Sequence, residues 1–245
     1  MAWLLPALIA VQFLSRLPVR LSGMPTPAQM GRSLCWYPAV GLLLGGLLVG
    51  FALLLHGAPP LLQAALLLAG WVLFSGALHL DGLADTADAW VGGFGDRERT
   101  LTIMKDPRSG PIAVVVLVML LLLKFAALVT LLPRGDWSAL LLAPWVARCL
   151  LPLLFLSTPY VRAGGLGQAL AEHLPRRALR WVLVAQVAAM LLLGWSGVLA
   201  LCTALLLFAL WRAALLRRLG GTTGDTAGAL VELSECAVLL VLALI

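Results

Sequence analysis

The chain has 245 residues, of which 62% are hydrophobic and 11% are charged, and its formal net charge is +6. Soluble domains usually carry about 25% charged residues, so this chain has too few charges to cover a surface that faces water. The positive balance does not indicate nucleic-acid binding, because basic residues in loops between apolar segments orient a chain in the membrane. We therefore expect the lipid bilayer as a partner and no nucleic acid.

The first apolar run, at residues 3–14, is short and contains Pro6. A helix needs about 20 apolar residues to cross the hydrocarbon core. Arginines follow this run, whereas a signal peptide places its positive charge first. We expect a short interfacial or re-entrant helix here. Clear candidates for spanning helices follow at residues 36–55, 61–80, 111–132, 138–157 and 226–245.

The stretch 181–211 is ambiguous, because as one helix it would measure roughly 46 Å against a hydrocarbon core of about 30 Å. It is either one long tilted helix or a hairpin with helices near 180–194 and 197–216. With the hairpin, fourteen of the seventeen lysines and arginines fall on one side of the membrane and only Arg134 on the other. The positive-inside rule therefore favours seven spans over six, with the N-terminus inside and the C-terminus outside.

The predicted fold is an all-α, polytopic membrane helix bundle with about seven transmembrane helices, in a single domain over residues 1–245. No internal repeat is visible, and no polar segment is long enough to fold alone. Gly41 and Gly45, four residues apart in the first long span, predict close packing against another helix, because small residues let helix backbones approach in lipid.

Three aspartates, Asp81, Asp85 and Asp88, follow the 61–80 run at steps of four and three. On a helix they lie within roughly 60° of one another. Carboxylates this close repel one another unless a cation intervenes, and oxygen ligands are those that Mg²⁺ prefers. The alternative is a solvated helix end, but the spacers are small or apolar. We predict that the three aspartates hold Mg²⁺ and that His79 only packs or hydrogen-bonds.

A second acidic group, Asp225, Glu232 and Glu235, lies in and before the last apolar run. Asp225 precedes Glu232 by seven residues, so the two can share a helix face. We predict that this group completes the metal shell or orients an attacking hydroxyl. The main alternative for the two glutamates is pairing with Arg148 or Lys124 inside the bundle.

Basic residues and a Gly/Thr-rich loop lie on the same predicted side as the acidic groups. Cations beside a metal–carboxylate site neutralise charge in phosphoryl transfer, and backbone N–H groups of such a loop can contact phosphate. The alternative for the loop cations is a topology signal alone. The candidate substrate-binding residues are Arg16, Lys105, Asp106, Arg108, Arg148, Thr223 and Gly224.

Several blocks of the sequence resemble the cobalamin synthase family, whose other name is adenosylcobinamide-GDP ribazoletransferase. The two specific blocks read LDGLADTAD at 80–88 and GDTxGAxxELxE at 224–235. They occur with the other blocks in the family's order and cover most of the chain. The remaining blocks lie at residues 13–19, 36–41, 103–108, 160–162 and 165–167.

This resemblance implies Mg²⁺-dependent transfer of cobinamide phosphate from adenosylcobinamide-GDP to α-ribazole or its 5′-phosphate, with release of GMP. It also implies a prokaryotic inner-membrane enzyme whose active site faces the cytoplasm. A homo-oligomer or contacts with other corrinoid-pathway enzymes are further expectations. Two alternatives stay open here. One is a CDP-alcohol-type lipid phosphotransferase, although Asp85 and Thr86 replace its Ala-Arg pair, and the other is a cation-coupled secondary transporter.

Overall fold

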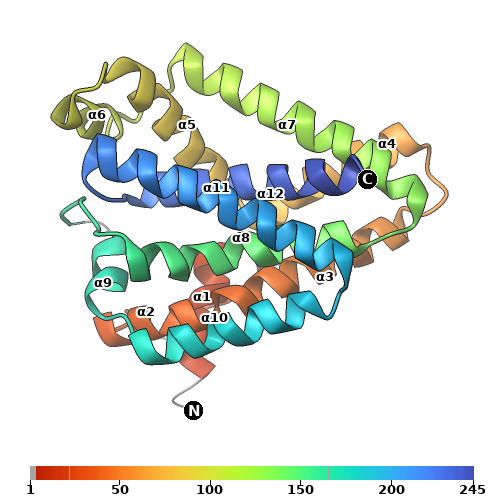
Figure 1. Ribbon diagram of the computed structural model, residues 1–245, viewed down its shortest axis with the longest axis horizontal. Coiled ribbons are helices and arrows are strands. Elements are labelled where there is room, and N and C mark those ends of the chain that lie inside the picture. The colour runs from red at the N-terminus through yellow and green to blue at the C-terminus, as the bar shows by residue number, and fades with distance from the viewer. Residues whose placement is uncertain (1–3, 22, 165) are drawn as a thin grey trace.

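The computed structural model describes residues 4–21, 23–164 and 166–245, and these residues fold almost entirely into helices. The long helices lie side by side, with the connecting loops gathered at the two ends of the bundle (Figure 1). Across the described residues the backbone forms one isolated β-bridge and no named strand. The expected all-α helix bundle is therefore confirmed.

Five helical segments of the described chain are long and apolar enough to cross a membrane, which makes this a multi-pass membrane protein. A sixth is obtained if the bent pair α4 (Pro60–Ser75) and α5 (Leu78–Gly92) counts as one span. The five are α2 (Pro27–Ser33) running through η1 (Leu34–Trp36) into α3 (Tyr37–Leu54), α7 (Pro111–Leu131) with η2 (Leu132–Arg134), α8 (Ser138–Ser157), α11 (Trp195–Leu219) and α12 (Gly224–Ala243).

The remaining helices are shorter. They are α1 (Leu4–Leu14), α6 (Arg97–Ile103), α9 (Leu166–Glu172) and α10 (Arg176–Leu191). The predicted hairpin is present, because α10 ends at Leu191 and α11 begins at Trp195, so the chain does not form one long helix there. With only 16 residues, α10 is shorter than the five spanning candidates.

The run expected as one helix at 61–80 is divided. Between α4 and α5 the chain bends by 88°. Gly76 and Ala77 form the corner, with positive φ angles of 67° and 57°. A left-handed conformation ends the α4 hydrogen-bond ladder. Asp81 therefore lies in the first turn of a new helix and not beyond the end of a span.

The centre of the bundle is α8, which packs against α3 on one side and α12 on the other. The predicted close packing at Gly41 and Gly45 is present. A Cβ added to Gly41 would lie 2.6 Å from the carbonyl oxygen of Pro144, and one added to Gly45 would lie 2.9 Å from the Cα of Leu141. Any side chain at these two positions would force α3 and α8 apart.

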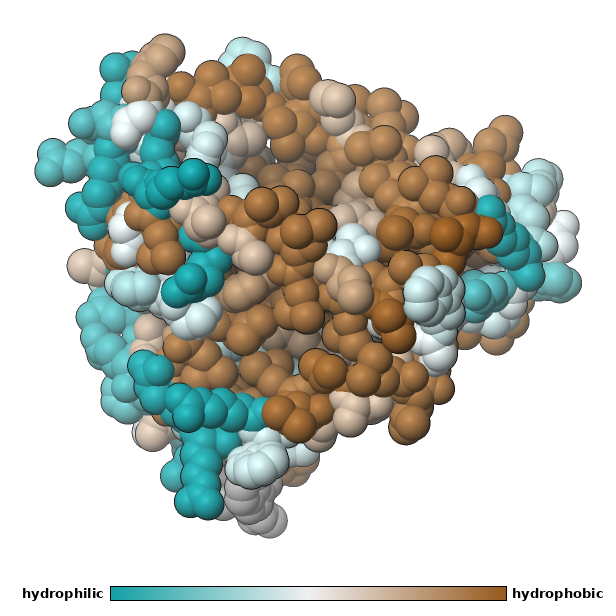
Figure 2. All heavy atoms as spheres, viewed as in Figure 1, coloured by the Kyte–Doolittle hydropathy of each residue, from teal (hydrophilic) through white to brown (hydrophobic). Residues whose placement is uncertain are grey.

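The surface is divided as expected for a protein in lipid. Figure 2 shows a broad hydrophobic surface along the bundle and hydrophilic residues gathered at the end where α6 and α9 lie. At the opposite end Arg134 donates hydrogen bonds to the last carbonyls of α12, with 2.9 Å from Nη2 to the Ala243 oxygen. Large apolar side chains on the lipid-facing helices are exposed, among them Leu73, Met119 and Leu206.

Candidate functional site

A cavity of about 470 Å³ lies between the first turns of α5 and α12 and the segment that follows α8. Four charged residues line it, two acidic and two basic: Asp81, Asp225, Lys105 and Arg162. Its other walls are largely apolar and aromatic. They include Phe13, Tyr37, Leu151, Phe155 and Tyr160. The cavity thus combines charged groups suited to phosphate and metal with an apolar interior.

The two acidic helices meet through positions that lack side chains. A Cβ added to Gly82 would lie 2.8 Å from the Asp225 carbonyl oxygen, so the backbones of α5 and α12 are in contact there. This contact brings the aspartates of the two sequence blocks together. Asp85 lies within electrostatic reach of Asp81, Asp225 and Asp88. The predicted convergence of the α5 aspartates with Asp225 is therefore present.

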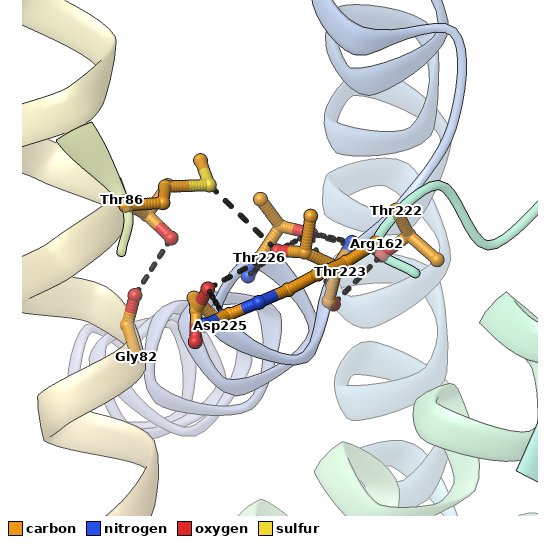
Figure 3. A network of polar contacts seen from close by, with 8 residues as sticks. Gly82, Thr86, Arg162, Thr222, Thr223, Asp225 and Thr226 are labelled. Carbon is orange, nitrogen blue, oxygen red and sulfur yellow. Dashed lines mark hydrogen bonds and ion pairs between the residues drawn. The ribbon is translucent and has the colours of Figure 1, made fainter. Parts of the chain in front are cut away.

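The first turn of α12 is held by threonines. The Thr223 hydroxyl accepts a hydrogen bond from the Thr226 N–H at 3.2 Å, and the Thr226 hydroxyl accepts one from the Thr223 N–H at 2.9 Å (Figure 3). Both threonines are buried. The Thr223 side chain, predicted to bind substrate, is thus engaged in this capping box. Gly224 lines the cavity, and its substrate contact stays a prediction.

Arg162 belongs to the site, although the sequence prediction did not include it among the site residues. Its Nη1 lies 2.6 Å from Oδ2 of Asp225 (Figure 3). A short backbone pairing places it there, because the Val161 N–H donates to the Thr222 carbonyl at 3.0 Å and the Thr222 N–H to the Pro159 carbonyl at 2.8 Å. The available signal was its place in the 160–162 block that resembles the family.

Asp88 has a different environment from the other aspartates of α5. Its two carboxylate oxygens accept backbone hydrogen bonds from Gly110 at 2.5 Å and Ala113 at 2.9 Å, at the start of α7. A carboxylate there also interacts favourably with the helix dipole. No three Asp, Glu, His or Cys side chains in the described part of the chain form a group that could hold a metal ion. Asp88 therefore anchors α7, and its predicted metal role stays untested.

The loop between α6 and α7 separates its two predicted phosphate contacts. Lys105 lines the cavity. Arg108 instead donates to Asp106, at 3.0 Å from Nε to Oδ1 and 2.8 Å from Nη2 to Oδ2, and its side chain is 87% exposed. These hydrogen bonds lower the pKa of Asp106 to about 2. Neither Asp106 nor Arg108 lines the cavity.

A second cavity of about 420 Å³ adjoins the first, and Asp81 is among the residues that line both. Arg16 lines this second cavity, together with the polar side chains of Gln12, Ser15 and Ser75. Arg16 is thus near Asp81, as the prediction of a phosphate contact requires. Asp81 borders two spaces, each with a basic side chain in its wall.

Glu232, Glu235 and Arg148 lie deeper in the bundle, and none of them lines either cavity. Lys124 Nζ lies 2.6 Å from Oε2 of Glu232 and 2.6 Å from Oε2 of Glu235. Arg148 pairs with the other oxygen of Glu235. All four side chains are almost fully buried. The structure therefore shows ion pairing of the two glutamates, which was the alternative to a catalytic role. The group formed by Lys124, Arg148, Glu232 and Glu235 is called the ion cluster below.

Comparison with known proteins identifies relatives over nearly the whole chain. Residues 6–243 match the family described as cobalamin-5-phosphate synthase. A protein named adenosylcobinamide-GDP ribazoletransferase from Ectopseudomonas mendocina (strain ymp) is 72% identical over 236 residues, 96% of this chain and 97% of that protein. Proteins of the same name from Pseudomonas paraeruginosa and Stutzerimonas stutzeri are 68% and 66% identical, over 97% and 98% of both chains.

No solved structure matches the chain. The lipid phosphotransferase and the secondary transporter, the two alternatives considered from the sequence, are not favoured by these relatives. The match extends from α1 to the end of α12 and includes every residue that lines the two cavities. The chain belongs to the cobalamin-5-phosphate synthase family.

Proposed function

We propose that this protein transfers the cobinamide phosphate moiety of adenosylcobinamide-GDP to α-ribazole or α-ribazole 5′-phosphate and releases GMP, as a step of cobalamin biosynthesis. The shared name of its relatives supports this reaction. The observation that carries the proposal is the cavity in which Asp81 and Asp225 lie with Lys105 and Arg162. Phosphoryl transfer depends on such positioning and charge neutralisation more than on covalent chemistry by the protein.

The donor set fits Mg²⁺. Asp81 and Asp225 line the cavity, and Asp85, which lines neither cavity, lies within electrostatic reach of both, so three hard carboxylates share one region. Mg²⁺ is commonly held by one or two protein carboxylates plus substrate phosphates, so a closed cage of three protein ligands is not needed. Asp81 and Asp85 would hold the ion, with Asp225 beside them. When bound, it would neutralise negative charge on the phosphate oxygens of the substrate.

In the proposed step, a ribose hydroxyl oxygen of the acceptor forms a bond to the phosphorus next to cobinamide. The bond from that phosphorus to the oxygen bridging to the GMP moiety breaks, and GMP leaves with this oxygen. The hydroxyl proton passes to a carboxylate of the site. Lys105 and Arg162 would bind the transferred phosphate, and Arg16 in the neighbouring cavity would contact the departing nucleotide.

The orientation proposed from the charge distribution places this site at the cytoplasmic face of the inner membrane. In that arrangement the chain crosses the membrane seven times, with α10 and α11 as a hairpin. The end of the bundle with α6 and α9 faces the cytoplasm, and the C-terminus lies outside. Reporter fusions at both termini test this, and a cytoplasmic C-terminus would rule out seven crossings.

The reaction is tested by incubating membranes that contain the protein with adenosylcobinamide-GDP, α-ribazole and Mg²⁺, and by measuring GMP. We expect GMP release that requires the acceptor and stops when a chelator removes the metal. Membranes from cells without the protein provide the control. Absence of GMP, with the protein present and folded, would refute the proposed reaction.

A further inference from the structure

Two stacked aromatic pairs line the larger cavity. The ring centroids of Phe13 and Tyr37 are 6.3 Å apart with planes at 21°, and those of Phe155 and Tyr160 are 6.1 Å apart at 26°. Tyr37 and Phe155 are only 1% and 6% exposed. The cavity therefore has a buried aromatic part beside its charged residues. Flat apolar surfaces of this kind bind planar rings by stacking.

His79 lines the same cavity and is 3% exposed. Its Nδ1 is buried and has no hydrogen-bond partner among the residues that the structure describes. A buried polar atom without a partner costs free energy, so native structures nearly always satisfy such atoms. The imidazole ring therefore borders the cavity with hydrogen-bonding capacity that the described residues leave unused.

We propose that the aromatic part of this cavity binds the base of the acceptor nucleoside, and that His79 donates a hydrogen bond to the free ring nitrogen of that base. This inference rests on the proposed function. The base of α-ribazole is a dimethylbenzimidazole, which is planar and apolar except for one free nitrogen that accepts a hydrogen bond. A neutral imidazole has one N–H to donate, and His79 provides it here.

The aromatic part of the wall suits this base better than guanine, the other base in the proposed reaction. Guanine has several donors and acceptors around its edge and needs a matching set of partners. Apart from the four charged residues and two tyrosines, His79 is the one polar side chain in the described lining. Burial raises the pKa of Tyr160, so its hydroxyl stays protonated at neutral pH. The volume of about 470 Å³ is within the usual range for small-molecule sites.

The decisive experiment compares two acceptors that differ in one ring atom. The first is α-ribazole, and the second is the matching dimethylindole riboside, in which a C–H replaces the free nitrogen. GMP release is measured with each acceptor for the wild type, His79→Phe and His79→Gln. We expect the wild type to prefer α-ribazole about tenfold or more in kcat/KM, since a site built to hydrogen-bond a group rejects the analogue that lacks it.

His79→Phe should remove this preference by weakening the use of α-ribazole alone, and His79→Gln, which keeps a donor, should restore part of it. The KM for adenosylcobinamide-GDP should stay unchanged in both variants. A role of His79 in packing alone would lower activity with both acceptors equally and leave their ratio as in the wild type. The ratio therefore separates recognition of the base from a structural effect.

The aromatic pairs are tested by Phe155→Leu, which should raise the KM for either acceptor severalfold, because the base loses a stacking surface. Phe51→Leu is the matched control. Phe51 packs edge-on against Phe74 at 6.1 Å, and it lines neither cavity. The KM of the Phe51→Leu variant for the acceptor should equal that of the wild type.

Equal use of the two acceptors by the wild type, or an unchanged ratio in His79→Phe, would overturn the proposal. If His79→Phe does not fold, the preference of the wild type for α-ribazole over the indole riboside and the KM of Phe155→Leu for the acceptor still test the proposal. If the wild type releases no GMP, the proposed reaction itself fails. Direct binding of α-ribazole and the indole riboside to the purified protein then tests the subsite alone, and equal affinities overturn it.

Discussion

Two groups of carboxylates on the same helix, α12, have opposite surroundings. Glu232 and Glu235 lie in the ion cluster, where two cationic side chains match them one for one in a nearly dry interior. Asp225 lies about two helical turns before Glu232 and lines the cavity, with Arg162 as its ion-pair partner and Asp81 and Asp85 nearby. The first group is balanced in charge and borders neither cavity, whereas the second borders an open cavity.

The two groups of carboxylates differ in the source of their countercharge. The cluster obtains its cations from α7 and α8, so it holds three helices together and has no charge left for a ligand. At the cavity two carboxylates and two cations border an open space, so charged side chains there remain accessible to a ligand. Acid residues at membrane depth are costly in either case, and the two groups meet that cost differently.

The largest expected effect is on the ion cluster. Glu235→Gln removes a carboxylate that pairs with both Lys124 and Arg148. Breaking a buried ion pair costs about 3–5 kcal/mol, so this variant should unfold at a clearly lower temperature in detergent than the wild type. Glu98→Gln, at an exposed position on α6, is the control. A Glu235→Gln protein with normal stability and no turnover would give the cluster a catalytic role.

The next effect concerns the open group. Asp81→Asn and Asp85→Asn should lower GMP release about 10²–10³-fold, the usual consequence of removing one stabilising group at a charged transition state. Thermal stability should stay close to that of the wild type, and any residual activity should need more Mg²⁺. A Mg²⁺ titration of each variant measures both properties. Near-normal activity at low Mg²⁺ in both variants would make these aspartates structural.

A smaller effect separates the two cations of the α6–α7 loop. Lys105→Ala should raise the KM for adenosylcobinamide-GDP about tenfold or more, because a hydrogen bond to a charged group is worth about 1.5–3 kcal/mol. Arg108→Ala should change it much less, since Arg108 is exposed and paired with Asp106. Equal effects of the two substitutions would show that Arg108 turns toward the substrate when it binds.

The smallest effect is expected at Asp88. Asp88→Asn weakens the anchor of α7 at Gly110 and Ala113, and loss of a helix-capping carboxylate costs about 0.5–2 kcal/mol. Unfolding in detergent should show this loss, while the Mg²⁺ concentration for half-maximal activity should not change. The opposite result, normal stability with a raised Mg²⁺ requirement, would return Asp88 to the metal site as the sequence spacing predicts.

The sequence was sufficient to predict the helix bundle and the α10–α11 hairpin, because hydropathy and charge asymmetry can be followed along the chain. The meeting of the α5 aspartates with Asp225 was expected from the chemistry of a shared metal site and from no local pattern. Arg162 was missed because many arginines lie on the same side, and only a backbone pairing between distant segments selects it. The role of Asp88 depends on the return of the chain to Gly110 after α6. The bend at Gly76 and Ala77 interrupts an otherwise apolar run, so hydropathy gave no sign of it.

The contact of α5 with α12 also has a consequence for biosynthesis. α12 is the last helix of the chain, and its backbone lies against Gly82. Domains assemble as the ribosome delivers them, from the N-terminus onward. The aspartates of α5 are therefore made early but have no partner on α12 until the residues from Gly224 onward have been synthesised. A nascent chain that stops before Gly224 therefore lacks one wall of the cavity.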